Sequence, residues 1–337
     1  MFQRFFVPLD GSLRAEKAIP IAAALARASA GTVILVSVVV PPLNEEYGAN
    51  IVSNEALLIQ GRERTEARAY LDEVIERYEQ VLEGLHLIVE VTSDTGTVAS
   101  SLLSLAEQEH TDLIVMCSRG GNWFKRWIFG SVAQNTIRHS PLPVLALNEH
   151  GLASVLENPT RPLRLLVPLD GSSFAEAVLR PLCQWLALFP STEPHELHLR
   201  QVVTILPAGG RLRSGANGPE LLQQDEMHRA EQYLQTVTQL ISGWIPEKIK
   251  VVVTTEVIAA PEVAGTLIKQ AQAKDVDLIV LATHGRSGIK RVFLGSVTEH
   301  IFGATTLPLF VVCPPAVEAE KESIGQGAQE AVRGSAG

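Results

Sequence analysis

Residues 7–12 read Val-Pro-Leu-Asp-Gly-Ser, and residues 167–172 read Val-Pro-Leu-Asp-Gly-Ser again. A second signature also occurs twice. Ser-Arg-Gly at 118–120 and Thr-His-Gly at 283–285 are each followed, after nine residues, by Gly-Ser-Val. The spacing between the copies is the same at both glycines of this signature. Two signatures that recur in the same order indicate that one whole domain is duplicated in tandem, because the period is too long for a solenoid unit.

The composition indicates a protein with two packed cores and disfavours a general binder of nucleic acids or membranes. Hydrophobic residues make up 46% of the 337, enough for two packed cores. The net charge of -9 disfavours general binding to nucleic acids or anionic membranes, since both need a basic surface. No leader is apparent, and the most apolar stretch, 32–43, is too short to span a bilayer. Cys117, Cys183 and Cys313 lie far apart in apolar runs, so we expect buried thiols and a cytoplasmic protein.

Apolar runs alternate with helical patterns in both halves. Strands are expected at 5–8, 32–40, 86–92, 113–117 and 143–147, then at 163–168, 197–203, 249–255, 278–282 and 309–312. Helices are expected at 15–29, 55–82, 97–110 and 131–139, then at 174–188, 219–242, 261–274 and 296–303. This alternation predicts the α/β class, as two tandem doubly wound domains, each with a five-stranded parallel sheet.

The predicted domains span residues 1–148 and 163–314. A linker at 149–162 joins them, and a disordered tail poor in bulky apolar residues occupies 315–337. Each domain ends in an apolar strand, and we expect the two terminal strands to pair as an intrachain pseudo-dimer, because an exposed apolar edge favours pairing.

Both signatures follow strands, and doubly wound sheets bind ligands at the carboxyl ends of their strands. Asp10 and Asp170 follow the first strand of each copy. Such an Asp can accept from a ribose hydroxyl or help to hold a cation. It can equally be a turn residue that caps the next helix. The sequence leaves both interpretations open.

The second signature is a glycine-rich loop that opens a helix. Glycines let backbone N–H groups approach a ligand closely, and a helix N-terminus favours phosphate. Basic side chains lie between the glycines: Lys125 and Arg126 in the first copy, and Arg286, Lys290 and Arg291 in the second. A structural turn with a solvated basic face is the competing interpretation, and the equal spacing of two copies weighs against it.

Other residues give weaker evidence of function. His195 and His198 could suggest a metal pair, but no further ligands cluster nearby, so packing or surface roles are expected. No arrangement of Ser, His and Asp or of Cys and His assembles into a catalytic site. Trp123 and Trp127 are interpreted as packing or lid residues.

At these residues the chain resembles the universal stress protein family, and each half resembles one complete family domain. The family's nucleotide loop is Gly-x2-Gly-x9-Gly-Ser/Thr after the fourth strand, and both copies match it from the second glycine onward. Cys117 and Ala282 replace the first glycine, and Arg119 stands where the second copy has His284. The resemblance implies a fold similar to the adenine nucleotide alpha hydrolases, which is Rossmann-like, and ATP as ligand, with Mg²⁺ as a candidate companion.

Carried over by position, the resemblance implies nucleotide-binding residues in both copies. They are Asp10, Val38, Ser118, Arg119, Gly120, Gly130 and Ser131 in the first, and Asp170, Val202, Thr283, His284, Gly285, Gly295 and Ser296 in the second. The second copy keeps closer to the family loop.

Two main hypotheses follow. The first is a stress-response or signalling protein in which ATP occupancy alters partner contacts or assembly. The second is an interaction module with degenerate pockets. No convincing general base is visible, so we do not expect a dedicated enzyme; slow ATP hydrolysis, self-phosphorylation at a loop Ser and association of two chains are left open. No nucleic acid or membrane partner is expected.

Overall fold

The structure is a computed structural model. It describes residues 2–40, 54–93, 96–117, 130–148, 152, 158, 160–205, 218–283 and 295–314. The predicted tail, both glycine loops and most of the predicted linker lie outside these ranges.

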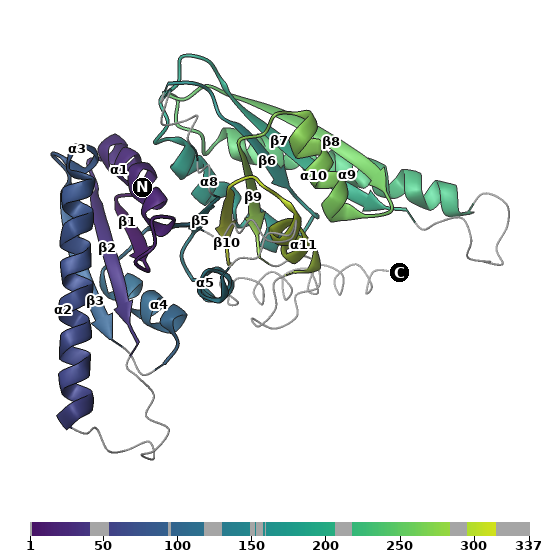
Figure 1. The fold of residues 1–337 in the computed structure, drawn as a ribbon. Helices are drawn as coiled ribbons and strands as arrows, with labels where there is room; N and C mark the ends of the chain where they lie inside the picture. The colour runs from purple at the N-terminus through teal and green to yellow at the C-terminus, as the bar shows by residue number, and fades with distance from the viewer. Residues whose placement is uncertain are drawn as a thin grey trace, which may run out of the picture.

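The first half alternates strands and helices as predicted (Figure 1). Its elements are β1 (Arg4–Leu9), η1 (Ala15–Lys17), α1 (Ala18–Ser29), β2 (Thr32–Val39), α2 (Asn54–Arg77), α3 (Glu79–Leu82), β3 (His86–Ser93), α4 (Val98–Gln108), β4 (Leu113–Cys117), α5 (Ser131–His139) and β5 (Val144–Leu147).

The second half repeats this order. Its elements are β6 (Arg164–Pro168), α7 (Ser173–Glu176), α8 (Leu179–Leu186), β7 (His195–Thr204), α9 (Gly218–Ser242), β8 (Val251–Ala260), α10 (Val263–Ala273), β9 (Leu278–Ala282), α11 (Ser296–Ala304) and β10 (Leu309–Val312).

Three predicted helices are interrupted. The helix expected at 15–29 begins as the short η1, and the one expected at 174–188 splits into α7 and α8. Pro20 and Pro181 are each the third residue of the longer segment. Proline has no N–H to donate and its ring crowds the carbonyl four residues back, so the regular helix does not extend further toward the N-terminus than the first turn that holds the proline. The helix expected at 55–82 breaks at Tyr78, between α2 and α3.

The ten strands of the described residues form one sheet, in the order β3-β2-β1-β4-β5-β10-β9-β6-β7-β8. Pairing is parallel within each half, which confirms the two predicted five-stranded parallel sheets. The register also repeats: Pro8 pairs with Val36 in the first half, and Pro168 pairs with Arg200 in the second.

The two halves join where β5 and β10 pair antiparallel, with Phe310 opposite Leu145. This confirms the predicted pairing of the terminal strands. Both strands are buried along their whole length, so the pairing covers two apolar edges that would otherwise be exposed. Phe2 of the first half packs edge-on against Phe310, with ring centres 6.5 Å apart, and Asn148 donates to the carbonyl of Thr306.

Helices cover both faces of the sheet. One core lies beneath α1, α2, α8 and α9 and continues across the junction between the halves. The other lies beneath α4, α5, α10 and α11. This is the doubly wound arrangement, which leaves the carboxyl ends of the strands and the loops that follow them to build a site.

Candidate functional site

A cavity of about 760 Å³ opens at the carboxyl ends of β6, β7 and β9 in the second half. Four of the residues predicted for nucleotide binding line it: Asp170, Val202, Gly295 and Ser296. Its walls are apolar on the α10 side, where Val263 and Leu267 lie, and polar on the α9 side, where Glu226, Arg229 and Tyr233 lie. Volume and lining are typical of a small-molecule site.

Val38 and Val202 occupy the same place in the two copies. Val38 lies two residues beyond Val36, the partner of Pro8, and Val202 lies two residues beyond Arg200, the partner of Pro168. The sequence comparison therefore put the second strands in the correct register, and Val202 lies in the cavity wall.

Asp10 and Asp170 each close a turn. Oδ1 of Asp10 accepts from the backbone N–H of Ser12 at 3.1 Å and from its hydroxyl at 2.5 Å, and Asp170 accepts from Ser172 at 3.0 and 2.6 Å. The intervening glycines, Gly11 and Gly171, have φ of 82° and 84°, a left-handed conformation that favours glycine. The turn interpretation of the Asp-Gly-Ser motif is therefore confirmed, and ligand binding by the same carboxylates stays a prediction.

The serine of this motif in turn accepts a hydrogen bond from the helical segment that follows it. The hydroxyls of Ser12 and Ser172 accept from the backbone N–H groups of Ala15 and Ala175, both at 3.2 Å. Asp10 is exposed, whereas Asp170 is half-buried and lines the cavity. The same motif thus positions a carboxylate beside a described cavity in the second copy.

Helices α5 and α11 begin at Ser131 and Ser296, as predicted, and Gly130 and Gly295 are their N-cap residues. No described side chain caps either N-terminus. The first residues of α11 line the cavity, and the dipole of a helix favours an anion at its N-terminus. The N–H of Gly295 donates to the carbonyl of Thr283 at 2.8 Å, and the Thr298 hydroxyl donates to that of Ala282 at 3.1 Å, which fixes α11 to the end of β9.

Five predicted residues lie outside the described parts of the chain: Ser118, Arg119, Gly120, His284 and Gly285. Thr283 is described and fully buried, with its N–H donating to the carbonyl of Val312 at 2.9 Å. Its backbone therefore joins β9 to β10 and to the start of α11.

Comparison with known proteins agrees with this architecture. The profile of the Universal stress protein family matches residues 1–148 and 163–313.

The chain belongs to the universal stress protein family.

Individual universal stress proteins are distant relatives of the chain. One from Methanocaldococcus jannaschii is 26% identical over 52% of this chain and 96% of its own length. One from Mycobacterium tuberculosis is 24% identical over 59% of this chain, and the match spans 61% of that relative. Solved structures of a universal stress protein from Archaeoglobus fulgidus and a putative one from Pseudomonas aeruginosa superpose with TM-scores of 0.63 and 0.59, at 17% and 15% identity. They cover 93% and 96% of this chain and 98% of their own chains.

Each copy contains a tyrosine–glutamate pair that was not predicted from the sequence, with its tyrosine on α2 in the first copy and on α9 in the second. The Tyr70 hydroxyl donates to Glu16 at 3.2 Å, and in the second copy Tyr233 lies beside Glu176 and lines the cavity. Burial, followed by the neighbouring carboxylate, raises the pKa of both phenols, which are therefore protonated at neutral pH. The pairs recur in the two copies, so a closer comparison of the helices could have marked these tyrosines and glutamates as repeated residues, although not their contact.

The cysteines and histidines behave largely as packing residues in this member of the universal stress protein family. Cys183 is buried as expected, whereas Cys117 and Cys313 are only partly so. Burial raises the pKa of Cys117 to about 12, which keeps its thiol protonated. His195 and His198 are buried, and the described residues contain no cluster of His, Cys, Asp and Glu suited to a metal ion. Nor does the described part of the chain contain a helix that is long and apolar enough to cross a membrane.

Proposed function

We propose that this tandem universal stress protein binds ATP in one or both halves, with the second half as the main site. The observation that carries the proposal is the convergence of Asp170, Val202, Gly295 and Ser296 on one cavity. These residues lie in three different segments of the sequence: Asp170 follows β6, Val202 lies in β7, and Gly295 and Ser296 lie at the start of α11.

Each part of ATP matches a part of the cavity. The N-terminus of α11 suits phosphate, Arg229 adds positive charge on the α9 side, and Val263, Leu267 and Leu281 offer an apolar surface for a base. Mg²⁺ usually keeps several waters and binds through one or two carboxylates plus phosphate. Asp170 and Glu226 are carboxylates in the cavity wall that could complete such a set.

The role we propose is signalling in the cytoplasm, where nucleotide occupancy alters contacts with partners or between two copies of the chain. The loops after β4 and β9 carry the basic residues of the family motif. A ligand held by these loops would change the charge and shape that they present. A slow ATP hydrolysis or self-phosphorylation would fit the same site and is not required by the proposal.

The test is nucleotide extraction from the purified chain, followed by calorimetry with ATP and Mg²⁺. We expect a dissociation constant below about 1 mM, which corresponds to about -4 kcal/mol. Gly295→Leu places a side chain in the cavity wall and should weaken binding at the second site at least tenfold, or about 1.4 kcal/mol. Gly130→Leu is the matched variant in the first half and should leave the second site unchanged.

Absence of both bound nucleotide and heat up to about 1 mM would contradict the proposal. If the two leucine variants also kept their partner binding and stress survival, the protein would instead act as an interaction module with degenerate pockets.

A further inference from the structure

Within the described residues, β3 and β8 form the two edges of the sheet. At β8, the N–H of His195 donates to the carbonyl of Lys250, and that of Ile205 donates to the carbonyl of Ala260. Backbone groups alternate sides along a strand, so the even-numbered residues of β8 face β7 and the odd-numbered ones point away from the sheet. The outer side of β8 is therefore a row of N–H and C=O groups that can pair with a further strand.

Arginines of α2 cover the corresponding row on β3. Nη2 of Arg64 donates to the carbonyl of Val91 at 3.1 Å, and Nη1 of Arg68 donates to the carbonyl of Val89 at 3.0 Å. These contacts occupy acceptors of the edge strand and place two charges beside it. Charged side chains at an edge are a common protection against pairing with another chain. The edge of the first half is thus protected.

Helix α9 lacks these arginines. Aligning the two tyrosines that lie beside glutamates also matches buried residues of the two helices: Leu71 with Leu234, and Val74 with Val237. In this alignment Arg64 and Arg68 correspond to Met227 and Glu231. A thioether and a carboxylate cannot donate a hydrogen bond to a carbonyl. The cover of the first edge is therefore not repeated at the second.

The outer carbonyls of β8 are accordingly open. Those of Thr255 and Val257 correspond to those of Val89 and Val91 in the common register. In the parts of the chain that the structure describes, no side chain donates to either of them. Thr255 is exposed, at the middle of a ten-residue strand that contains no proline. Length and composition both favour pairing.

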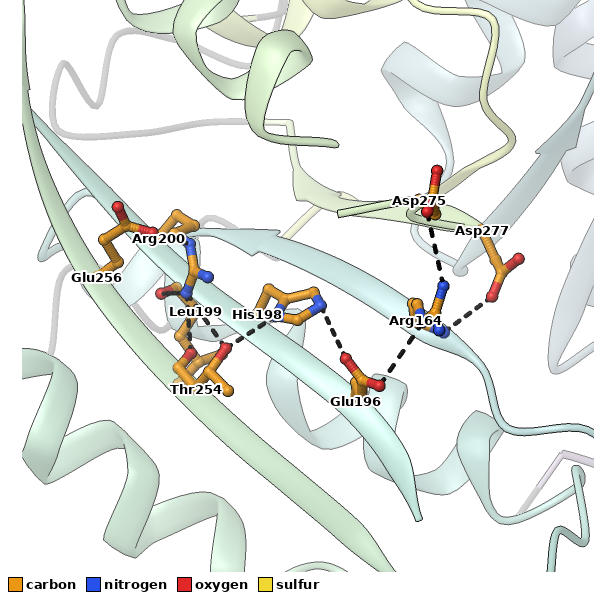
Figure 2. A network of polar contacts seen from close by, with 9 residues as sticks. All are labelled: Arg164, Glu196, His198, Leu199, Arg200, Thr254, Glu256, Asp275 and Asp277. Atoms are coloured by element: carbon orange, nitrogen blue, oxygen red, sulfur yellow. Dashed lines mark hydrogen bonds and ion pairs between the residues drawn. The ribbon is translucent and has the colours of Figure 1, made fainter. Parts of the chain in front are cut away.

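The charge on β8 is neutralised from within the sheet (Figure 2). Glu256 is the only charged residue of the strand, and Nε of Arg200 lies 3.1 Å from its carboxylate. Arg200 is 3% exposed, and its Nη1 also donates to the carbonyl of Thr254 at 3.1 Å. In the first half Glu90 takes the place of Glu256, but Val36 takes that of Arg200. The second edge has therefore lost protection on both faces of the sheet.

The backbone of β8 is complementary to that of a second β8. When two copies run antiparallel with their Thr255 residues opposite each other, Val251 faces Ala259 and Val253 faces Val257. All of these are odd-numbered residues, whose backbone groups point outward. Every outward residue of one strand thus meets an outward residue of the other, as the hydrogen-bonded pairs of an antiparallel ladder require.

The side chains between them match in the same register. Val252, which is 46% exposed, faces Ile258 of the second copy, so an aliphatic surface is covered. Glu256 faces Thr254 and not its own counterpart. Like charges directly opposite each other destabilise a strand pair, whereas aliphatic pairs stabilise it. The register that satisfies the backbone therefore also suits the side chains.

Charges at the ends of β8 favour the antiparallel direction. The segment before the strand carries Glu247, Lys248 and Lys250, a net positive charge, and Glu262 follows the strand. All four are exposed. Antiparallel pairing brings the positive end of one copy to Glu262 of the other, whereas parallel pairing brings like charges together. A second copy of the chain is therefore the partner that the edge itself fits.

We propose that the β8 edge is an interface between two copies of this chain, which pair antiparallel about a twofold axis and join their sheets into one. A twofold axis uses the same surface on both copies, so the contact closes at a dimer. The inference goes beyond the proposed function and does not depend on nucleotide binding. The β3 edge, covered by Arg64 and Arg68, does not take part.

Sedimentation velocity of the full chain without nucleotide, over a series of concentrations, tests the interface. We expect a monomer–dimer equilibrium with a dissociation constant between about 1 and 100 µM, in keeping with a small interface. Met227→Arg combined with Glu231→Arg introduces the cover of the first copy and should weaken dimerisation at least about tenfold. This change makes the chain less negative, so a weaker dimer would not reflect general repulsion between chains. Leu222→Arg, at an exposed place on the same helix, is the control and should leave the dimer unchanged.

Thr255→Pro probes the strand directly. The N–H of Thr255 points away from β7, so proline removes no bond within the sheet, and edge strands tolerate proline at such a position. It should abolish the dimer by removing the central donor of the interface and crowding the second strand. Circular dichroism checks that the variants are folded, and the arginine variant supplies the reading if the proline variant is not.

A wild-type chain that stays monomeric up to about 100 µM would overturn the inference, even if the edge took up an extended peptide instead. So would a dimer that persists unchanged in the folded variants, because its interface would lie elsewhere. Either result leaves the proposed nucleotide site intact, since that site is measured separately by calorimetry.

Discussion

At the scale of single residues, His195 shows how a buried polar group is accommodated. Its Nδ1 accepts from the N–H of Leu163 at 3.0 Å, and its Nε2 lies 2.9 Å from the carbonyl of Phe189. A neutral ring with its proton on Nε2 satisfies both contacts, whereas a second proton on Nδ1 would face an N–H donor. The imidazole therefore ties the loop before β7 to the start of β6.

The chain should lose stability in mild acid. Burial lowers the pKa of His195 below its ordinary value, so the folded state favours the neutral ring. Its contribution is complete above about pH 6.5 and is lost as the pH falls below that value, by at most about 1.4 kcal/mol per pH unit. Urea unfolding between pH 8 and 5 measures this slope. His195→Gln should reduce the slope, and an identical slope in that variant would rule out the assignment.

At the scale of elements, the two copies cap equivalent helices differently. Glu262 accepts from the N–H groups of Ala264 and Gly265 at 2.8 and 2.5 Å, at the start of α10. Thr97 caps α4 in the first copy, where its hydroxyl accepts from the backbone N–H of Ser100 at 3.2 Å. Both satisfy N–H groups that the first helical turn leaves unpaired.

Glu262→Ala should lower the free energy of unfolding by about 1 kcal/mol, the usual cost of losing an N-terminal cap. Glu262→Thr introduces the capping residue that the first copy has at this position and should retain most of the stability. Urea unfolding followed by circular dichroism compares the two variants. If alanine and threonine proved equally destabilising, the cap would not be the source of the effect.

Much of this level of structure was predictable from the sequence, because it depends on local pattern. Apolar runs identified the strands, and the family resemblance assigned Val38 and Val202 to matching positions of the second strands. Pattern did not reveal that Pro20 and Pro181 would divide their helices. Nor did it reveal that Arg200 would meet Glu256 and Thr254, or that Tyr233 would lie beside Glu176. Those contacts join residues far apart in the chain, and only the packed sheet and helices bring them together.

At the scale of the whole molecule, the junction of β5 and β10 makes one sheet from two domains. The core beneath α1 and α8 crosses it, with Phe2 and Phe310 in contact. We therefore expect the halves to unfold together rather than as independent lobes.

Phe2→Ala should weaken this connection, because it removes a ring that is only 5% exposed. Truncation of a buried Phe costs about 3 kcal/mol or more. The expected result is a lower urea midpoint and, where the halves uncouple, two transitions in place of one. Leu13→Ala, at a side chain that is 68% exposed, is the control and should change stability by less than about 0.5 kcal/mol. Equal effects of the two substitutions would show that the junction contributes little.

The antiparallel pairing of β5 with β10 has a geometric consequence. Strands within each half run parallel, so reversal at the junction sends the carboxyl ends of β1 and β4 to one rim of the sheet and those of β6 and β9 to the opposite rim. The described ends of β4 and β9, after which the two glycine loops follow in the sequence, therefore lie on opposite rims. Any two molecules bound at these two rims would therefore lie at opposite ends of the strands of one continuous sheet.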